Sequence, residues 1–463
     1  MASPSRAIHV FKSREVKIIQ FVLLLVCALM LSIASSRAGL TPKVKQPNIV
    51  IFLSDDHGQE DAGCYGNSDL KTPVLDQMAA EGLKFTRAYT PVPVCAPSRS
   101  ALYTGLYPHR NGGDRNHGSI RDDIRTLPMY LAEAGYEVVL AGKVHVKPES
   151  AFPFRYIERD EVPAFLKNAG DKPFCLIVAF NAPHQPYFNM KGGFGKVQPK
   201  KWLPITKETL KYTAAYYDHV TMLDHELGAY LYWLQKYGKD QNTVQIYTSD
   251  HGPAFPFAKW TLYEQGIRVP LIVKWPGVVP PATTSNALVS LVDVLPTLME
   301  MAGHAAIAGL DGVSMLPLLK QQSTTLHQEV YAAYTNLGVE GGNDYPIRSI
   351  IEVDTKLLVN LRYKNTLALE SMDARDDRAV IDPLVVLDSW RTSKTPGVAA
   401  RAKAYKTRPL LELYDLKTDP YELHNLAAEN SPKYRHLTER LYRKLAGWMR
   451  SQGDYLATEM TVY

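Results

Sequence analysis

Cysteine is scarce in this chain, with four residues in 463. Cys27 lies in an N-terminal apolar segment and Cys95 in a motif with Pro and Arg at fixed offsets, so the one remaining disulfide would join Cys64 and Cys175. Cys175 falls in an apolar, strand-like run and Cys64 in a Gly-Cys-Tyr-Gly turn. We therefore predict two buried free thiols and no disulfide.

Glycosylation signals are absent, and the net charge is small. The chain has no Asn-x-Ser/Thr triplet, which argues against a glycosylated lysosomal or extracellular animal enzyme and favours a bacterial periplasm. The formal charge is +5, of which residues 1–36 carry +3 because four Lys/Arg outnumber one Glu, so about +2 remains for the rest. This small charge gives no reason to expect acidic partners, and we predict that the protein does not bind nucleic acid.

Only one segment is apolar enough to enter a membrane. It is the run 21–30, which is followed by small residues at 34–36 and preceded by four basic residues: Arg6, Lys12, Arg14 and Lys17. This layout predicts a signal peptide over residues 1–36. An uncleaved anchor is the alternative, although the run is short for a bilayer span. We expect an exported protein, periplasmic or secreted, or lysosomal in a eukaryote, with no membrane contact beyond the leader.

The rest of the chain alternates between strand and helix patterns. Four short apolar runs lack the alternation of half-exposed strands and predict strands covered on both faces: 48–53, 136–141, 174–180 and 243–248. Helical patterns cover 72–82, 126–135 and 207–237. We predict an α/β domain with a large, mainly parallel sheet over residues 45–325 and a smaller C-terminal α+β domain over 326–463, with a strand-like run at 356–362 and a final helix at 432–452.

Polar residues follow each of the four predicted strands. They are Asp55, Asp56 and His57; Lys143 and His145; His184; and Asp250 and His251. Ligands of open α/β sheets bind beyond the carboxyl ends of the strands, so these side chains should converge on one site. Its three carboxylates are hard oxygen donors that suit Ca²⁺ or Mg²⁺. We therefore predict a divalent metal site.

Cys95 opens the most informative stretch of the chain, Cys-Ala-Pro-Ser-Arg-Ser-Ala-Leu-Tyr-Thr-Gly. Pro97 suits the first turn of a helix and Gly105 its end, which places Cys95 at a helix N-terminus. Unpaired N–H groups and the helix dipole favour an anion there. A small buried cysteine and a thiolate nucleophile activated by the dipole are the alternative interpretations.

This stretch resembles the Cys-x-Pro-x-Arg motif of type I sulfatases, in which an exported cysteine is converted to formylglycine. Further stretches resemble the heparan N-sulfatase (N-sulfoglucosamine sulfohydrolase) branch of that family: residues 142–146, 182–184, 250–256 and 345–349. A segment at 413–426 is similar to sulfatase C-terminal domains in general. The resemblance covers nearly the whole chain after the leader and implies the alkaline-phosphatase-like sulfatase fold.

The resemblance also implies roles for individual residues. Asp55, Asp56 and Asp250 match the ligands of one calcium ion, whose shell the formylglycine oxygen of residue 95 completes; Mg²⁺ and Zn²⁺ are the alternatives. His251 stands where the family often has Asn or Gln, and we expect it to be a ligand as well. The residues that match those holding the formylglycine and the sulfate are Arg99, Lys143, His145, His184 and Lys259.

The function implied by the resemblance is hydrolysis of a sulfated sugar, with the N-sulfate of glucosamine in heparan sulfate or heparin fragments as the branch-level expectation. It requires a maturation enzyme that generates formylglycine from Cys95. The alternatives are an O-sulfatase of another glycan, a phosphodiesterase or phosphonate monoester hydrolase of the same superfamily, and an inactive glycan-binding protein. Arg348 is either a contact for a uronate or sulfate group or part of a salt bridge. The sequence does not predict an oligomeric state.

Overall fold

The computed structural model describes residues 46–188, 197–369, 380–381, 383–429 and 431–461. The predicted signal peptide, with Cys27, lies outside the described residues. Within them, no helix combines the length and the apolar character needed to cross a membrane.

The centre of the molecule is an eight-stranded sheet. Its strands run in the order β10 (Thr283–Ser285), β2 (Leu83–Phe85), β9 (Leu271–Lys274), β8 (Thr243–Ser249), β1 (Asn48–Ser54), β6 (Phe174–Ala179), β4 (Glu137–Gly142) and β5 (Arg155–Ile157). Only β9 pairs antiparallel, with β2 on one side and β8 on the other. The four predicted strands are β1, β4, β6 and β8, which are mutually parallel neighbours, so their carboxyl ends meet at one edge.

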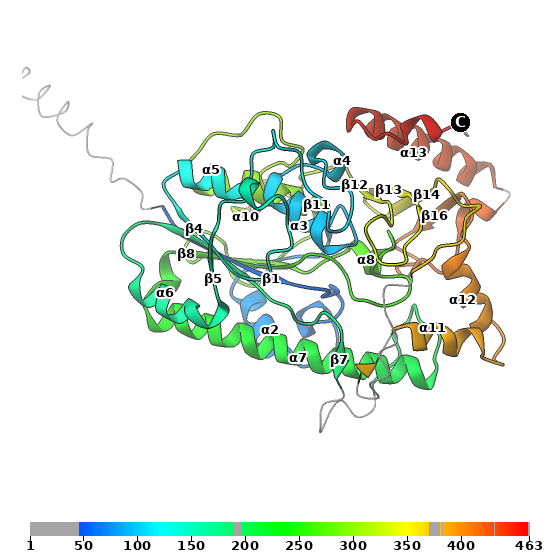
Figure 1. The fold of residues 1–463 in the computed structure, drawn as a ribbon, viewed down its shortest axis with the longest axis horizontal. Coiled ribbons are helices and arrows are strands. Elements are labelled where there is room, and N and C mark those ends of the chain that lie inside the picture. The colour runs from blue at the N-terminus through cyan, green and yellow to red at the C-terminus, as the bar shows by residue number, and fades with distance from the viewer. Residues whose placement is uncertain (1–45, 189–196, 370–379, 382, 430, 462–463) are drawn as a thin grey trace, which may run out of the picture. The chain divides into compact units, whose positions relative to one another are not determined.

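Helices cover both faces of this sheet, which explains why its strands are apolar throughout. One face packs against α2 (Pro73–Ala80), α6 (Val162–Asn168) and α7 (Lys207–Lys236) through side chains such as Phe52 and Val178. The other packs against α3 (Cys95–Thr104), α5 (Leu127–Glu133), α9 (Val294–Met301) and α10 (Leu316–Leu319) through Ile51 and Ile177. Figure 1 shows α2 and α7 below the sheet and α3, α5 and α10 above it.

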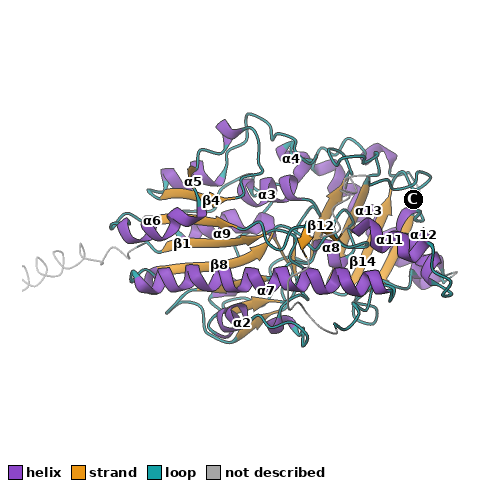
Figure 2. Cartoon of the chain, turned by 60° about the horizontal axis from the view of Figure 1, so that its bottom comes forward, coloured by secondary structure: helices purple, strands orange, loops and turns teal. Residues whose placement is uncertain are grey.

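A second, antiparallel sheet follows along the chain. Its order is β12 (Glu329–Tyr334), β13 (Ile347–Glu352), β14 (Thr355–Asn360) and β16 (Leu411–Asp415), and α13 (Pro432–Ser451) packs on it. Figure 2 shows the two sheets side by side, with α7 running along both. Buried residues of this second sheet, such as Val330 and Tyr334, share one apolar cluster with aromatic residues of α7, including Tyr212 and Tyr216. The division at residues 45–325 and 326–463 stays a prediction.

The remaining elements are short. They are α4 (Pro108–Asn111), α8 (Glu264–Ile267), α11 (Pro383–Arg391), α12 (Val398–Lys406), the pair β3 (Ala88–Tyr89) with β11 (Val289–Ser290), the pair β7 (Tyr187–Phe188) with β15 (Val380–Ile381), and 3-10 turns at Gly63–Tyr65, Glu149–Ala151, Arg159–Glu161, Asp240–Asn242, Leu291–Asp293, Leu426–Ala428 and Ala457–Glu459.

The cysteine prediction needs one correction. Cys64, Cys95 and Cys175 are all free thiols, as expected for Cys64 and Cys175. Cys175 is fully buried in β6, but Cys64 is only half-buried, because its short 3-10 turn lies at the surface beside α2.

Candidate active site

Cys95 is the first residue of α3, as its sequence motif predicts. Val94 is extended, and Gly105 ends the helix in a left-handed conformation with φ of 65°, which glycine adopts without strain. Every residue of α3 is buried, and Cys95 is 3% exposed. The thiol therefore lies at a buried helix N-terminus, where the helix dipole favours negative charge.

The polar residues after the four parallel strands converge around this thiol. Cys95 Sγ lies 3.1 Å from His251 Nε2 and 3.4 Å from Asp55 Oδ1. Two overlapping groups have their ligand atoms within 4.8 Å of one another: Asp55, Asp56, Cys95 and His184, and Asp55, Cys95, Asp250 and His251. The five predicted metal ligands thus lie together, and their metal-binding role stays a prediction.

The buried carboxylates are paired with the predicted basic residues. Lys259 Nζ donates to both oxygens of Asp56, at 2.8 and 2.9 Å, and Lys143 forms an ion pair with Asp55. Arg99 Nε donates to Asp250 Oδ2 at 3.0 Å, and both side chains are completely buried. Even Lys259, whose turn carries little sequence information, belongs to this cluster.

Crowding of these charges shifts the pKa values of the groups. Burial and the nearby charges of Asp250 and Cys95 raise the pKa of Asp55 to about 7. Burial also opposes ionisation of Cys95, but the charges of Lys259, His251 and Lys143 outweigh it and hold the pKa of the thiol well below its usual range. Burial likewise opposes the charged form of His251, yet Asp250 and Cys95 raise the pKa of this histidine to about 9. The site strongly favours an anion at residue 95.

The residues fit a divalent cation. Burial, followed by the nearby negative charges of Asp250 and Cys95, raises the pKa of Asp55, and a bound cation would relieve this penalty on the ionised carboxylates. Carboxylate oxygens favour calcium or magnesium, whereas the His251 nitrogen and the Cys95 sulfur are donors that zinc also accepts.

Two further histidines border Cys95. His184 Nδ1 lies 2.5 Å from the backbone carbonyl oxygen of Gln185, and the ring contacts the thiol. His145 also contacts the thiol, and its Nε2 atom lies 2.9 Å from Nδ1 of His117. His117 was not predicted from the sequence, because it lies in a loop between Gly112 and Gly118 and no strand or helix pattern places it near the site.

Two residues singled out in the sequence lie elsewhere. His57 turns away from the site: its Nδ1 lies 2.6 Å from Tyr247 Oη and its Nε2 2.7 Å from the Asp61 carbonyl oxygen. Arg348 is fully buried, and it donates to the two oxygens of Asp454 at 2.5 and 3.0 Å. The salt-bridge interpretation of Arg348 is therefore the one that the structure shows.

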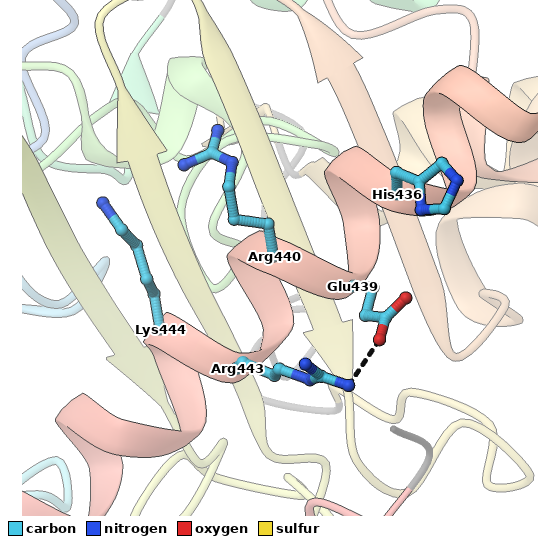
Figure 3. Close-up of a pocket in the computed structure, with 5 residues that line it drawn as sticks. All are labelled: His436, Glu439, Arg440, Arg443 and Lys444. Atoms are coloured by element: carbon cyan, nitrogen blue, oxygen red, sulfur yellow. Dashed lines mark hydrogen bonds and ion pairs between the residues drawn. The ribbon is translucent and has the colours of Figure 1, made fainter.

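A surface hollow on α13 does not compete with this site. It is lined by His436, Glu439, Arg440, Arg443 and Lys444. Arg440 donates to both oxygens of Glu352, and Lys444 donates to Glu352 as well. Figure 3 shows the ion pair of Arg443 with Glu439. The Arg and Lys side chains that line the hollow are already paired with carboxylates, so the hollow attracts anions weakly.

Comparison with known proteins gives the family. The sequence model of the sulfatase family matches residues 47–157 and 157–304, and the model described as N-sulphoglucosamine sulphohydrolase, C-terminal, matches residues 250–380. An ulvan-active sulfatase of Formosa agariphila is 36% identical over 436 residues, which cover 90% of this chain and 82% of the relative. The human N-sulphoglucosamine sulphohydrolase is 31% identical over 493 residues, which cover 92% and 93% of the two chains.

Solved structures agree on the fold. One, a complex with its substrate D-glucosamine-2-N,6-O-disulfate, superposes with a TM-score of 0.68 at 21% identity and covers 89% of this chain and 99% of that one. Another, a 2-O glycosaminoglycan sulfatase, superposes with a TM-score of 0.69 at 21% identity and covers 89% of this chain and 94% of that one. The predicted alkaline-phosphatase-like fold is confirmed, and the chain belongs to the sulfatase family of sulfuric ester hydrolases.

Proposed function

We propose that this protein removes sulfate from a sulfated sugar, with the N-sulfate of glucosamine in heparan sulfate or heparin fragments as its preferred group. The observation that carries the activity is the thiol of Cys95 at a buried helix N-terminus, within hydrogen-bonding distance of His251 and Asp55. The N-sulfate is supported by the match of residues 250–380 to the N-sulphoglucosamine sulphohydrolase C-terminal region and by the human relative.

Residue 95 and a cation supply the reactive groups. Formylglycine made from Cys95 by a maturation enzyme would provide, as its hydrate, the attacking hydroxyl. Asp55, Asp56, Asp250 and His251 would hold one calcium ion, which would lower the pKa of that hydroxyl and bind a sulfate oxygen. The predominance of oxygen donors favours calcium or magnesium over zinc, and the family resemblance favours calcium of the two.

The basic residues bind and orient the sulfate. Lys143, Lys259 and Arg99 already neutralise the carboxylates of the site, and cations in these positions stabilise the negative charge that develops on sulfate oxygens during transfer. The burial of Lys259 and Arg99 excludes water and strengthens their interactions.

The histidines move protons. In its protonated form His184 carries hydrogens on both ring nitrogens: the one on Nδ1 faces the carbonyl oxygen of Gln185, and the one on Nε2 is given to the departing nitrogen or oxygen of the sugar. His145, on the other side of residue 95, is placed to take a proton from a hydroxyl group there.

A second candidate substrate is an O-sulfated glycan of another kind. The ulvan-active sulfatase is 36% identical over 90% of this chain, a higher identity than that of the human N-sulphoglucosamine sulphohydrolase. Both substrates would be met outside the cytoplasm if residues 1–36 act as the predicted leader.

Sulfate release by the converted enzyme tests this proposal. We expect turnover of N-sulfoglucosamine to exceed that of 6-O-sulfated glucosamine, and Cys95→Ala to abolish both. Activity confined to O-sulfated sugars would keep the mechanism and replace the substrate. A preference for an aryl phosphodiester would contradict the proposal, and an intact-mass measurement at residue 95 shows whether a silent preparation was converted at all.

A further inference from the structure

His117 forms a direct contact with His145 beside the reactive residue. The two ring nitrogens, His117 Nδ1 and His145 Nε2, are 2.9 Å apart, and the ring centroids are 4.7 Å apart. Both residues are left-handed, with φ of 59° for His117 and 47° for His145. Such a conformation is costly for a residue other than glycine and marks places where surrounding contacts impose it.

The loops that carry the two histidines are tied to each other and to the second sheet. Ile120 N donates to the Lys147 carbonyl oxygen at 2.9 Å, which joins the two loops. Asn116 N donates to the Leu337 carbonyl oxygen at 3.0 Å, and Thr335 Oγ1 donates to that of Asp114 at 3.1 Å. The segment after β12 therefore holds His117 in place although its side chain is exposed.

The ring nitrogen of His145 that His117 does not engage is Nδ1. This atom is buried and bonds to no group within the described part of the chain except residue 95, which the ring contacts. A buried ring nitrogen is costly unless such a neighbouring group satisfies it. Because Nε2 is engaged by His117, Nδ1 is the atom left to accept a proton from residue 95.

We propose that His117 is a positioning residue that fixes the ring orientation and the tautomer of His145. Nδ1 of His117 accepts a hydrogen bond from Nε2–H of His145, so Nδ1 of His145 keeps its lone pair and points at residue 95. When the hydroxyl left on residue 95 after sulfate transfer gives its proton to that lone pair, the electron pair of its O–H bond would form the aldehyde C=O and the C–O bond to the sulfate would break, releasing sulfate. His145 then becomes an imidazolium that still donates to His117 through Nε2. The proton then leaves to solvent. This inference rests on the proposed sulfatase reaction.

Three substitutions separate positioning from folding. His117→Asn keeps an acceptor oxygen near the position of Nδ1 and tolerates a positive φ, whereas His117→Gly removes the acceptor and relieves the backbone strain. His436→Asn is the matched control, because His436 is an exposed histidine on α13 (Figure 3), a helix that packs on the second sheet.

With N-sulfoglucosamine as substrate, we expect His117→Gly to lower kcat by about 10- to 100-fold with KM nearly unchanged, and His117→Asn to restore most of it. His436→Asn should match the unaltered enzyme. An equal loss in the Asn and Gly variants, or an increase of KM in place of a decrease of kcat, would overturn the proposal, the latter by making His117 a substrate contact.

Nitrogen NMR of ¹⁵N-histidine-labelled protein tests the tautomer without turnover. In enzyme converted to formylglycine at residue 95, we expect His145 to carry its hydrogen on Nε2, and in converted His117→Gly we expect a mixture of both nitrogens. A hydrogen on Nδ1 in the converted, otherwise unaltered enzyme contradicts the proposal. If no sulfated sugar is turned over, the proposed function fails while this measurement still decides the role of His117.

Discussion

At the scale of single residues, the site is a set of buried charges that depend on one another. Arg99 and Asp250 are completely buried, and Lys259 is 3% exposed against a fully buried Asp56. Removing one partner of such a pair leaves an uncompensated buried charge, which costs about 3 to 5 kcal/mol. Substitutions in this cluster therefore lower stability together with activity, and activity assays on them need a folding control.

A histidine outside the site predicts how stability depends on pH. Burial and the charge of Arg348, which Asp454 only partly offsets, lower the pKa of His109 from 6.5 to about 4. The folded state then binds its proton less readily than the unfolded chain, so the stabilisation is complete above pH 6.5 and is lost as pH falls through about 4.

The variant His109→Gln keeps an acceptor for Arg348, which lies 3.0 Å from His109 Nε2, and does not titrate. Between about pH 7 and pH 4.5, we expect the urea-derived free energy of unfolding to fall by about 2 kcal/mol more in the unaltered protein than in this variant. Parallel pH curves for the two proteins would show that His109 titrates normally in the folded state.

At the scale of elements, local patterns predicted what local interactions decide. The helix at Cys95 has Pro97 in its first turn and Gly105 after its last residue, and β1, β4, β6 and β8 begin and end within two residues of their apolar runs. The loop of His117 was not predicted, because its conformation depends on a hydrogen bond to Leu337, more than 200 positions away. Contacts of this kind leave no periodic pattern in the sequence.

Gly338 lets the segment after β12 approach that loop. Its φ is +73°, and a Cβ atom there would lie 2.0 Å from the Asn116 carbonyl oxygen. We expect Gly338→Ala to displace Asn116 and His117 and to lower kcat for sulfate release about tenfold or more. Gly397→Ala is the matched control, because Gly397 has a φ of +84° but a Cβ atom added there would have nothing within 4 Å.

Both glycine variants carry the same backbone penalty of roughly 1 to 2 kcal/mol in thermal unfolding, so only the Gly338 variant tests the contact. Equal activity of the two variants would mean that the His117 loop does not depend on the segment after β12.

At the scale of the whole molecule, the position of the buried carboxylates predicts that binding of a metal would stabilise the fold. Asp55, Asp56 and Asp250 come from the ends of two strands, and the unfolded chain does not hold them together. We expect calcium to raise Tm and a chelator to lower it, because a ligand at ~100 times its Kd stabilises a folded protein by about 2.7 kcal/mol.

Asp250→Asn removes one of the charges and should shrink the calcium-dependent shift of Tm. Asp123→Asn, an exposed carboxylate, is the control and should keep the full shift. An unchanged Tm across calcium, magnesium and zinc would contradict a metal at this position, and the largest shift with zinc would change the identity of the ion.

The α/β class, the position of Cys95 at a helix N-terminus and the convergence of four strand ends were predictable from the sequence, because they follow from short-range periodicity, helix capping and the common direction of parallel strands. Tertiary structure alone decided that His57 faces Tyr247, that Arg348 pairs with Asp454 and that His117 meets His145. In each case the partner comes from a distant part of the chain, and packing of one element against another selects which way a polar side chain turns.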